Sequence, residues 1–156
     1  ALVRRKVAGP RRLAIFGGSY GGYMTAWAVG HTRRFRCAVA MAPVINNLSQ
    51  YGTCDIPDFM LYSGGDRAVS FTDKFWYEQS PLHYADRVRT PTLIITGEID
   101  ARVPPGQSFE FYRALKARGV ETRLVLFPRE PHGVNEPQHR LHYFQMILEW
   151  INEHCR

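Results

Sequence analysis

The sequence has few cysteines and no long hydrophobic run. Its 156 residues include three cysteines, Cys37, Cys54 and Cys155, which are widely spaced and odd in number. This spacing fits neither a disulfide framework nor a zinc site, so we expect a reducing compartment, the cytoplasm. No segment is long enough to cross a bilayer, and the first residues lack the apolar stretch of a signal peptide. We therefore expect no membrane partner.

Acidic residues are absent from the first 36 positions. That stretch contains only basic charges, while the net charge of the whole chain is +6. The basic residues concerned are Arg4, Arg5, Lys6, Arg11, Arg12, Arg33, Arg34 and Arg36. No DNA- or RNA-binding motif accompanies them. We expect a solvated face, or a contact with an acidic segment outside this sequence, and no nucleic-acid partner.

Apolar runs and helical patterns alternate along the chain, which predicts an α/β fold. The runs at 13–16, 36–42, 92–96 and 122–127 have the length of buried strands. Helices are expected at 23–29, 82–85, 105–118 and 138–152. Such alternation predicts a parallel sheet with helices on both faces. The length fits one domain or part of one.

Two segments contain many apolar side chains, and the sequence pattern predicts where these side chains pack. Segment 46–79 combines turn signals with many aromatic residues, so it either lines a pocket or packs under a long loop. In the last helix, Leu141, Phe144, Leu148 and Ile151 fall on one stripe, as in an amphipathic helix. Met24 and Trp27 are interpreted as core residues of the first helix.

A G-x-S-x-G motif lies between the first strand and the first helix. It runs from Gly17 to Gly21, with Ser19 at its centre and Leu13–Phe16 before it. A strand, a tight glycine turn and a helix form the context in which such a serine is a nucleophile. The alternative is a glycine-rich turn whose serine only caps the helix.

Three polar residues follow three of the expected strands, namely Ser19, Asp100 and His132. Because ligands gather at the carboxyl ends of parallel strands, we expect these residues to lie together. Their order along the chain is that of an α/β-hydrolase triad. His132 would take the serine proton, Asp100 would fix the imidazole tautomer, and the backbone N–H of Tyr20 would bind the oxyanion.

Other residues could compete for these roles. Asp86 and Glu98 are alternative acids but are less well placed around the strand at 92–96. His139 and His142 have a spacing that suggests a metal pair, yet no third ligand is evident, so we expect solvent-exposed side chains and no metal. His83 is interpreted as a histidine on a helix surface.

Several segments resemble the catalytic domain of the prolyl oligopeptidase family of serine peptidases, in its acylaminoacyl-peptidase and dipeptidyl-peptidase-like branch. These segments are GGSYGGYMT, NNLSQYGTCDI, GEIDARVPPGQ, FYRALKARGVETRLVLFP and EPHG. The resemblance implies an α/β-hydrolase fold, the triad Ser19, Asp100 and His132, and no cofactor. It also implies that Arg102 binds a substrate carbonyl and that Val103 lines the first substrate pocket.

Two departures from the family accompany this resemblance. Dipeptidyl peptidases tend to have asparagine at the position of Arg102. Family members also carry a β-propeller and further strands upstream, including an HGG-type loop, so residues 1–156 are predicted to be the C-terminal portion of a peptidase catalytic domain without its first strands. We expect a serine peptidase that cleaves short peptides through an acyl-enzyme and that can form a homo-oligomer. The alternatives are a carboxylesterase on the same fold and a non-catalytic truncated fragment.

Overall fold

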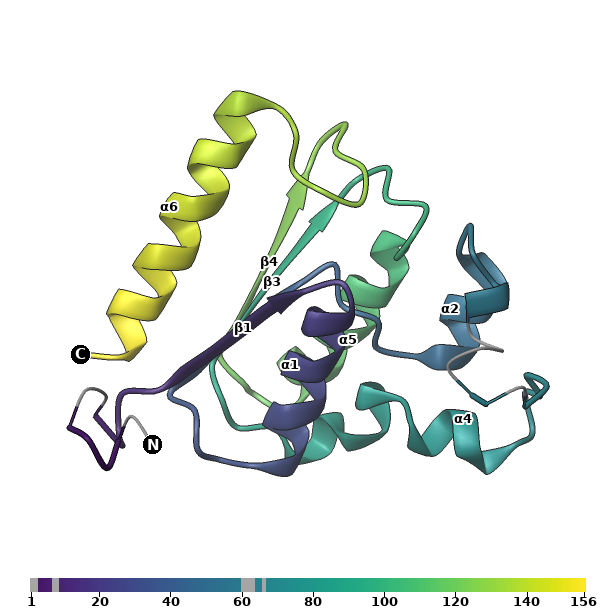
Figure 1. Cartoon of the computed structure of the whole chain (residues 1–156), viewed down its shortest axis with the longest axis horizontal. Helices are drawn as coiled ribbons and strands as arrows, with labels where there is room; N and C mark the ends of the chain where they lie inside the picture. The colour runs from purple at the N-terminus through teal and green to yellow at the C-terminus, as the bar shows by residue number, and fades with distance from the viewer. Residues whose placement is uncertain (1–2, 7–8, 60–63, 66) are drawn as a thin grey trace.

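The computed structural model describes residues 3–6, 9–59, 64–65 and 67–156, and in these ranges strands and helices alternate (Figure 1). The strands are β1 (Ala14–Gly18), β2 (Cys37–Met41), β3 (Thr92–Gly97) and β4 (Thr122–Phe127). The helices are α1 (Tyr20–His31), α2 (Asn47–Thr53), α4 (Lys74–Glu78), the 3₁₀ helix η1 (Pro81–Arg87), α5 (Pro105–Ala117) and α6 (Pro137–His154). Each strand overlaps a segment that the sequence predicted as a strand.

The four strands form one parallel sheet in the order β1-β2-β3-β4. From β2 onward, each strand is therefore hydrogen bonded to the strand that precedes it in the chain. The four carboxyl ends lie along one edge of the sheet, because all pairs are parallel. The predicted parallel sheet is confirmed.

Helices cover both faces of the sheet, as Figure 1 shows. On one face, α1 and α5 pack against the sheet through a cluster that includes Val29, Ile94 and Phe111. On the other face, α6 packs through Trp150 in a cluster that includes Leu93. Because neighbouring residues of a strand point to opposite faces, an unbroken apolar run such as Leu93-Ile94 supplies both cores.

The face of α6 that packs on the sheet differs from the predicted one. Of the predicted stripe, Leu141, Phe144 and Leu148 are 55–63% exposed, and only Ile151 packs against the core. The buried side chains are Met146, Ile147 and Trp150. Helix α6 is thus apolar on two sides, and periodicity alone cannot select the side that meets the sheet. In α1, Met24 is likewise 44% exposed, so its assignment to the core is wrong.

Segment 46–79 leaves the sheet after β2 and ends just before η1, which packs against α1 and α5. Its described part contains α2 and α4, while residues 60–63 and 66 lie outside the described residues. Asn46 caps α2 by accepting hydrogen bonds from the N–H groups of Leu48 and Ser49. Trp76 of α4 is buried. Within the described ranges, no helix combines the length and the apolar character needed to cross a bilayer.

Candidate active site

Ser19 lies in the turn between β1 and α1, at the carboxyl edge of the sheet. Its backbone has φ 58° and ψ −120°, in the left-handed half of the map that non-glycine residues rarely adopt. Two hydrogen bonds hold it there: its N–H donates to the Met41 carbonyl, and its carbonyl accepts from the Tyr23 N–H, each at 2.9 Å. Gly17 permits the turn, because a Cβ there would lie 2.5 Å from the carbonyl oxygen of Gly21.

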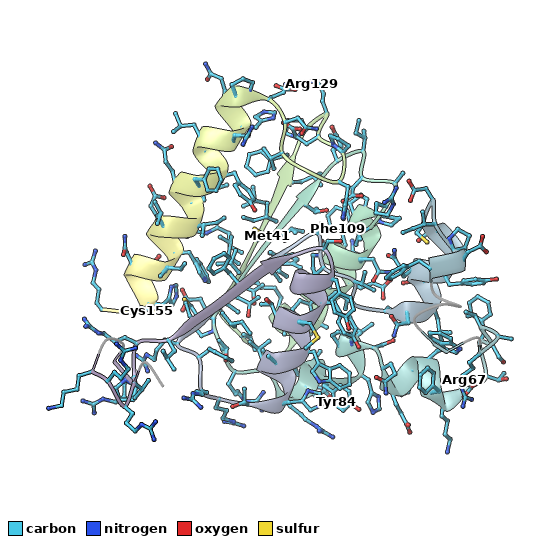
Figure 2. The ribbon with its side chains drawn as sticks, in the orientation of Figure 1. Met41, Arg67, Tyr84, Phe109, Arg129 and Cys155 are labelled. Carbon is cyan, nitrogen blue, oxygen red and sulfur yellow. The ribbon has the colours of Figure 1, made fainter. Side chains whose placement is uncertain are left out.

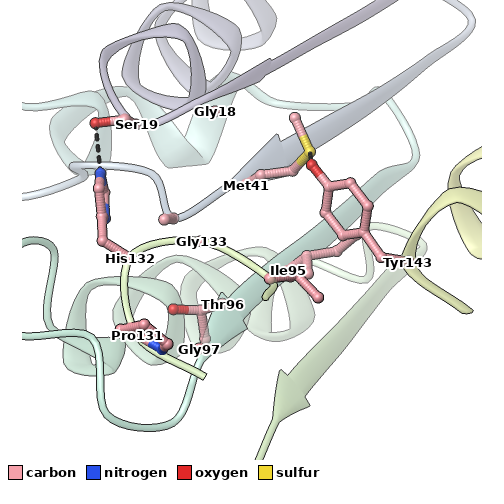
Figure 3. Close-up of a pocket in the computed structure, with 12 residues that line it drawn as sticks. Gly18, Ser19, Met41, Ile95, Thr96, Gly97, Pro131, His132, Gly133 and Tyr143 are labelled. Carbon is pink, nitrogen blue, oxygen red and sulfur yellow. Dashed lines mark hydrogen bonds between the residues drawn. The ribbon is translucent and has the colours of Figure 1, made fainter. Parts of the chain in front are cut away.

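The hydroxyl of Ser19 points away from α1 and makes no capping hydrogen bond to it. It lies instead 2.9 Å from Nε2 of His132, from the loop after β4 (Figure 3). The other ring nitrogen of His132, Nδ1, lies 2.8 Å from Oδ2 of Asp100. A carboxylate only accepts, so Nδ1 carries the proton and Nε2 is left to accept from the serine hydroxyl.

Asp100 is held in place by the turn that follows β3. Its side chain is fully buried, and Oδ1 accepts the backbone N–H groups of Arg102 at 2.9 Å and Val103 at 2.8 Å. The two carboxylate oxygens thus have separate tasks, since one holds the turn and the other faces His132. A buried carboxylate fixed in this way can orient an imidazole and stabilise its protonated form.

A second carboxylate, Glu130, holds the loop that carries His132. Its side chain is 1% exposed and accepts the N–H groups of Asn135 at 2.7 Å and Glu136 at 2.9 Å. Nδ1 of His139 lies 2.8 Å from the same carboxylate. Burial raises the pKa of Glu130, but the two N–H groups and the His139 ring outweigh burial and leave its pKa below the usual range.

This arrangement corrects the prediction for His139, whose ring is mostly buried and paired with Glu130 rather than exposed. His139, Glu130 and Glu136 are close enough to hold a metal ion. Both oxygens of Glu130 already accept hydrogen bonds from the loop, however. The contacts therefore explain the cluster as a brace for the loop.

The loops of Asp100 and His132 are also bound to each other through their backbones. The N–H of Ile99 donates to the carbonyl of Glu130 at 3.1 Å. Gly97, at the end of β3, lies so close to the carbonyls of Glu130 and Pro131 that a Cβ there would overlap both. Only glycine allows this approach, which sets the spacing between the acid and the histidine.

The competing candidates lie away from His132. Asp86 pairs with Arg118 at 2.6 Å, and Glu98 accepts the N–H of Arg129 at 3.0 Å. His142 is exposed, as expected. His83 lies on η1 and is half-buried with a buried Nδ1, so its ring is only partly at the helix surface.

Two hollows adjoin the turn of Ser19 and Tyr20. The first, of about 260 Å³, contains Ser19 and His132 in its wall together with Met41, Ile95 and Tyr143 (Figure 3). The Tyr143 hydroxyl contacts the sulfur of Met41 and closes the side of this hollow toward α6. Its floor is formed by the ends of the strands and is largely apolar.

The second hollow, of about 160 Å³, lies between α1 and segment 46–79. Tyr20 and Tyr23 form one side of it, and Phe59, Phe75 and Trp76 are among the residues on the other. The aromatic segment 46–79 was expected either to line a pocket or to pack under a long loop, and its described part lines a pocket. Burial raises the pKa of Tyr23 to about 12, so its hydroxyl stays protonated and donates to the Gln79 carbonyl at 2.9 Å.

Arg102 and Val103 lie next to Asp100. The Arg102 guanidinium pairs with Asp55, with Nε 2.6 Å from Oδ1, and keeps about 44% of its side chain exposed. This contact lowers the pKa of Asp55 and raises that of Arg102. The Arg102 carbonyl accepts from Gln50, which lines the second hollow. Val103 is buried and lines neither hollow.

Tyr20 is the first residue of α1. Its backbone N–H therefore belongs to the first turn, whose N–H groups have no partner within the helix. This N–H lies in the peptide unit directly after Ser19 and is available to an anion beside that residue. The side chain of Tyr20 is 62% exposed and stacks on Tyr23, with ring centroids 5.4 Å apart.

Comparison with known proteins gives consistent matches over the whole chain. The sequence profile of the Prolyl oligopeptidase family matches residues 1–156. The chain is 39% identical over 158 residues to the "Uncharacterized peptidase YuxL" of Bacillus subtilis (strain 168), covering 99% of this chain and 24% of that protein. It is 36% identical over 158 residues to the acylamino-acid-releasing enzyme of Arabidopsis thaliana, covering 96% of this chain and 21% of that one.

A solved structure has the same fold. An acylaminoacyl peptidase in complex with Z-Gly-Gly-Phe-chloromethyl ketone superposes with a TM-score of 0.92 at 29% identity, covering 99% of this chain and 25% of that one. The predicted α/β-hydrolase fold is thereby confirmed for these residues. The chain spans about a fifth to a quarter of the length of the proteins it matches.

Proposed function

The chain belongs to the prolyl oligopeptidase family, and from this premise we propose that it carries the catalytic groups of a serine peptidase. The observation that carries the proposal is the continuous hydrogen-bonded chain from the Ser19 hydroxyl through His132 to the buried Asp100. A serine hydroxyl is a weak nucleophile until a base within hydrogen-bond reach takes its proton. We assign residues 1–156 to the C-terminal portion of a catalytic domain.

In the proposed reaction, the Ser19 oxygen attacks the carbonyl carbon of the substrate while Nε2 of His132 takes the hydroxyl proton. Asp100 holds Nδ1–H and stabilises the positive imidazolium. His132 then gives its proton to the leaving amine, and an acyl-enzyme forms on Ser19. Water, deprotonated by His132, attacks the acyl group, and the proton returns to Ser19 as the acid product leaves.

The negative oxygen of the tetrahedral intermediate needs hydrogen-bond donors on one side of Ser19. We propose the backbone N–H of Tyr20 as one donor, because it opens α1 and lacks an intrahelical partner. The amino end of α1 adds a partial positive charge at the same place. A fixed backbone donor needs no reorganisation when the charge develops, which makes it effective in the transition state.

We propose that the substrate is a short peptide whose side chain enters the aromatic hollow next to Tyr20. The walls of that hollow favour an apolar side chain. Arg102 lies at the same side of the triad, since its carbonyl is bound by Gln50 of the hollow. We propose that its exposed guanidinium binds a peptide carbonyl of the substrate. Val103, expected to line the first substrate pocket, is buried and lines neither hollow. The peptide ligand in the structure of the similar acylaminoacyl peptidase agrees with a substrate of this class.

The proposal is tested with a fluorophosphonate probe, because such a probe labels only an activated serine. In the complete protein, labelling is expected at Ser19 and is lost in Ser19→Ala, whereas Ser49→Ala, on α2, labels normally. Removing one member of a triad typically lowers kcat by about 10⁴ to 10⁶. Labelling that persists in Ser19→Ala would refute the assignment of the nucleophile.

The type of substrate is tested separately. The values of kcat/KM on peptide anilides and on nitrophenyl esters are compared in the same preparation. A peptidase is expected to cleave both, with a strong dependence on the peptide sequence. Hydrolysis of esters alone would instead identify a carboxylesterase. A protein that neither reacts with the fluorophosphonate probe nor hydrolyses any of the substrates would be non-catalytic.

A further inference from the structure

Cys37 and Cys155 are far apart in the sequence but adjacent in the structure. Cys37 is the first residue of β2 and is fully buried, and Cys155 directly follows α6 and is half-buried. Their sulfur atoms lie 3.8 Å apart. A disulfide bond is about 2.05 Å long, so the two sulfur atoms would have to move toward each other by less than 2 Å to form one.

The two thiols differ in reactivity. Burial, reinforced by the neighbouring Cys155, raises the pKa of Cys37 to about 12, so Cys37 is nearly always protonated at neutral pH. Cys155 is the more accessible of the two. A reaction that begins with a thiolate therefore begins at Cys155.

Four arginines form a hollow of about 430 Å³ at the same end of the sheet. Arg11 and Arg12 lead into β1, Arg36 precedes Cys37, and Arg156 follows Cys155. Figure 2 shows Cys155 at the end of α6, beside the segment that leads into β1. In the described part of the chain, none of the four makes an ion pair with a carboxylate.

We propose that Cys37 and Cys155 are a modification site that a small anionic disulfide, such as glutathione disulfide, converts into an intramolecular disulfide. The arginine hollow would hold the carboxylates of the oxidant. Guanidinium groups bind carboxylates through two parallel hydrogen bonds, and arginines that have no carboxylate partner can do so without breaking an ion pair.

The reaction consists of two exchange steps. The Cys155 thiolate attacks one sulfur of the small disulfide, which forms a mixed disulfide on Cys155 and releases one small thiolate. Cys37 then loses its proton to that thiolate and attacks the Cys155 sulfur, and the second small thiolate leaves and takes up the proton that Cys155 released. Two protein thiols become one disulfide, and one small disulfide becomes two small thiols.

The disulfide would join the start of β2 to the end of α6. It would lie at the amino end of the sheet, whereas Ser19 and His132 lie at the carboxyl end. Oxidation is therefore expected to leave the labelling of Ser19 unchanged and to raise the midpoint of thermal unfolding, since it closes a loop of more than 100 residues. The site does not depend on the proposed peptidase activity.

The proposal is tested by incubating the complete protein with glutathione disulfide, followed by mass spectrometry of the intact protein and its peptides. The expected product has lost about 2 Da and contains a peptide pair that joins Cys37 to Cys155. Cys54→Ser is the matched control and must give the same product, while Cys155→Ser must give none. A stable glutathione adduct on Cys155 with Cys37 still reduced would overturn the pairing, and so would two unreacted thiols.

The role of the arginines is tested by the choice of oxidant. At low salt, the charged glutathione disulfide should react faster than the neutral bis(2-hydroxyethyl) disulfide. In the wild-type protein the difference in rate should be about tenfold or more, as for electrostatic attraction into a charged hollow. Replacing Arg36 and Arg156 by glutamine should remove most of this difference. Replacing Arg113, an exposed arginine of α5, should change nothing. Equal rates for the two oxidants in the wild-type protein would contradict an anion site.

Discussion

Replacing Asp100 by asparagine tests the proposed triad with little change in shape. In the structure, Oδ1 accepts the N–H groups of Arg102 and Val103, while Oδ2 faces Nδ1 of His132. An asparagine can keep only one of these arrangements. If its oxygen stays on the two N–H groups, its amide N–H₂ points at Nδ1, and His132 must then carry its proton on Nε2.

The free energies favour that orientation. Turning the amide around would leave two backbone N–H donors facing an N–H₂ group, and each unsatisfied buried donor costs about 1–3 kcal/mol, or about 2–6 kcal/mol in total. With the proton on Nε2, His132 cannot accept the proton of Ser19. The corresponding change in a serine-protease triad lowers kcat by about 10⁴, which is about 5.4 kcal/mol in activation free energy.

The assay measures kcat/KM on a peptide anilide and the rate of fluorophosphonate labelling in the complete protein, with thermal unfolding as the control for folding. Both rates should fall by about 10⁴ in Asp100→Asn, and the unfolding midpoint should change little because the N–H bonds remain. Asp86→Asn is the matched control at an exposed acid and should keep full activity. A folded Asp100→Asn protein with more than a tenth of the wild-type rate would show that Asp100 is not the acid of the triad.

Three further predictions concern the surroundings of the triad. Arg102→Ala should lower kcat/KM on peptides by about ten- to a hundredfold more than on a small activated ester, since one charge-assisted hydrogen bond is worth about 1.5–3 kcal/mol. Equal losses of kcat/KM on both substrates would indicate that the ion pair of Arg102 with Asp55 is only structural. Gly97→Ala should push the Glu130 and Pro131 carbonyls away and lower both kcat and the midpoint of thermal unfolding. Gly106→Ala should be tolerated, because a Cβ there meets open space. Similar effects of the two variants on kcat and on thermal unfolding would contradict this prediction. Residues 1–156 expressed alone should associate and be nearly inactive compared with the complete protein, because β1 lies at the edge of the described sheet and Phe16 is 62% exposed. A monomer by light scattering that is active in peptidase assays would contradict this prediction.

The local features of this fold can be predicted from the sequence. The turn at Ser19 combines an apolar strand, flanking glycines and a helix within about 15 residues, so its conformation depends on neighbours in the chain. Asp100 and His132 could be predicted because both follow buried strands, and parallel strands end at one edge. This edge of the sheet can be located from the positions of the strands alone, without the details of side-chain packing.

Features that depend on long-range contacts could not be predicted. Helix α6 carries two apolar stripes, and only its contact with β2 and β3 decides that Trp150, rather than Phe144, is buried. The brace formed by Glu130 depends on the conformation of its loop, in which Arg129 has a positive φ of 62°. Cys37 and Cys155 meet across 118 positions, and no local pattern records such a contact.

The order of the strands has a consequence for protein synthesis. From β2 onward, each strand pairs with the one made just before it, so this part of the sheet can grow strand by strand as the chain leaves the ribosome. Ser19 is at the start of this series, and His132 follows the last strand. An incomplete chain that ends before β4 would therefore hold the proposed nucleophile without its base, and a nascent or prematurely terminated product would be unable to hydrolyse its neighbours.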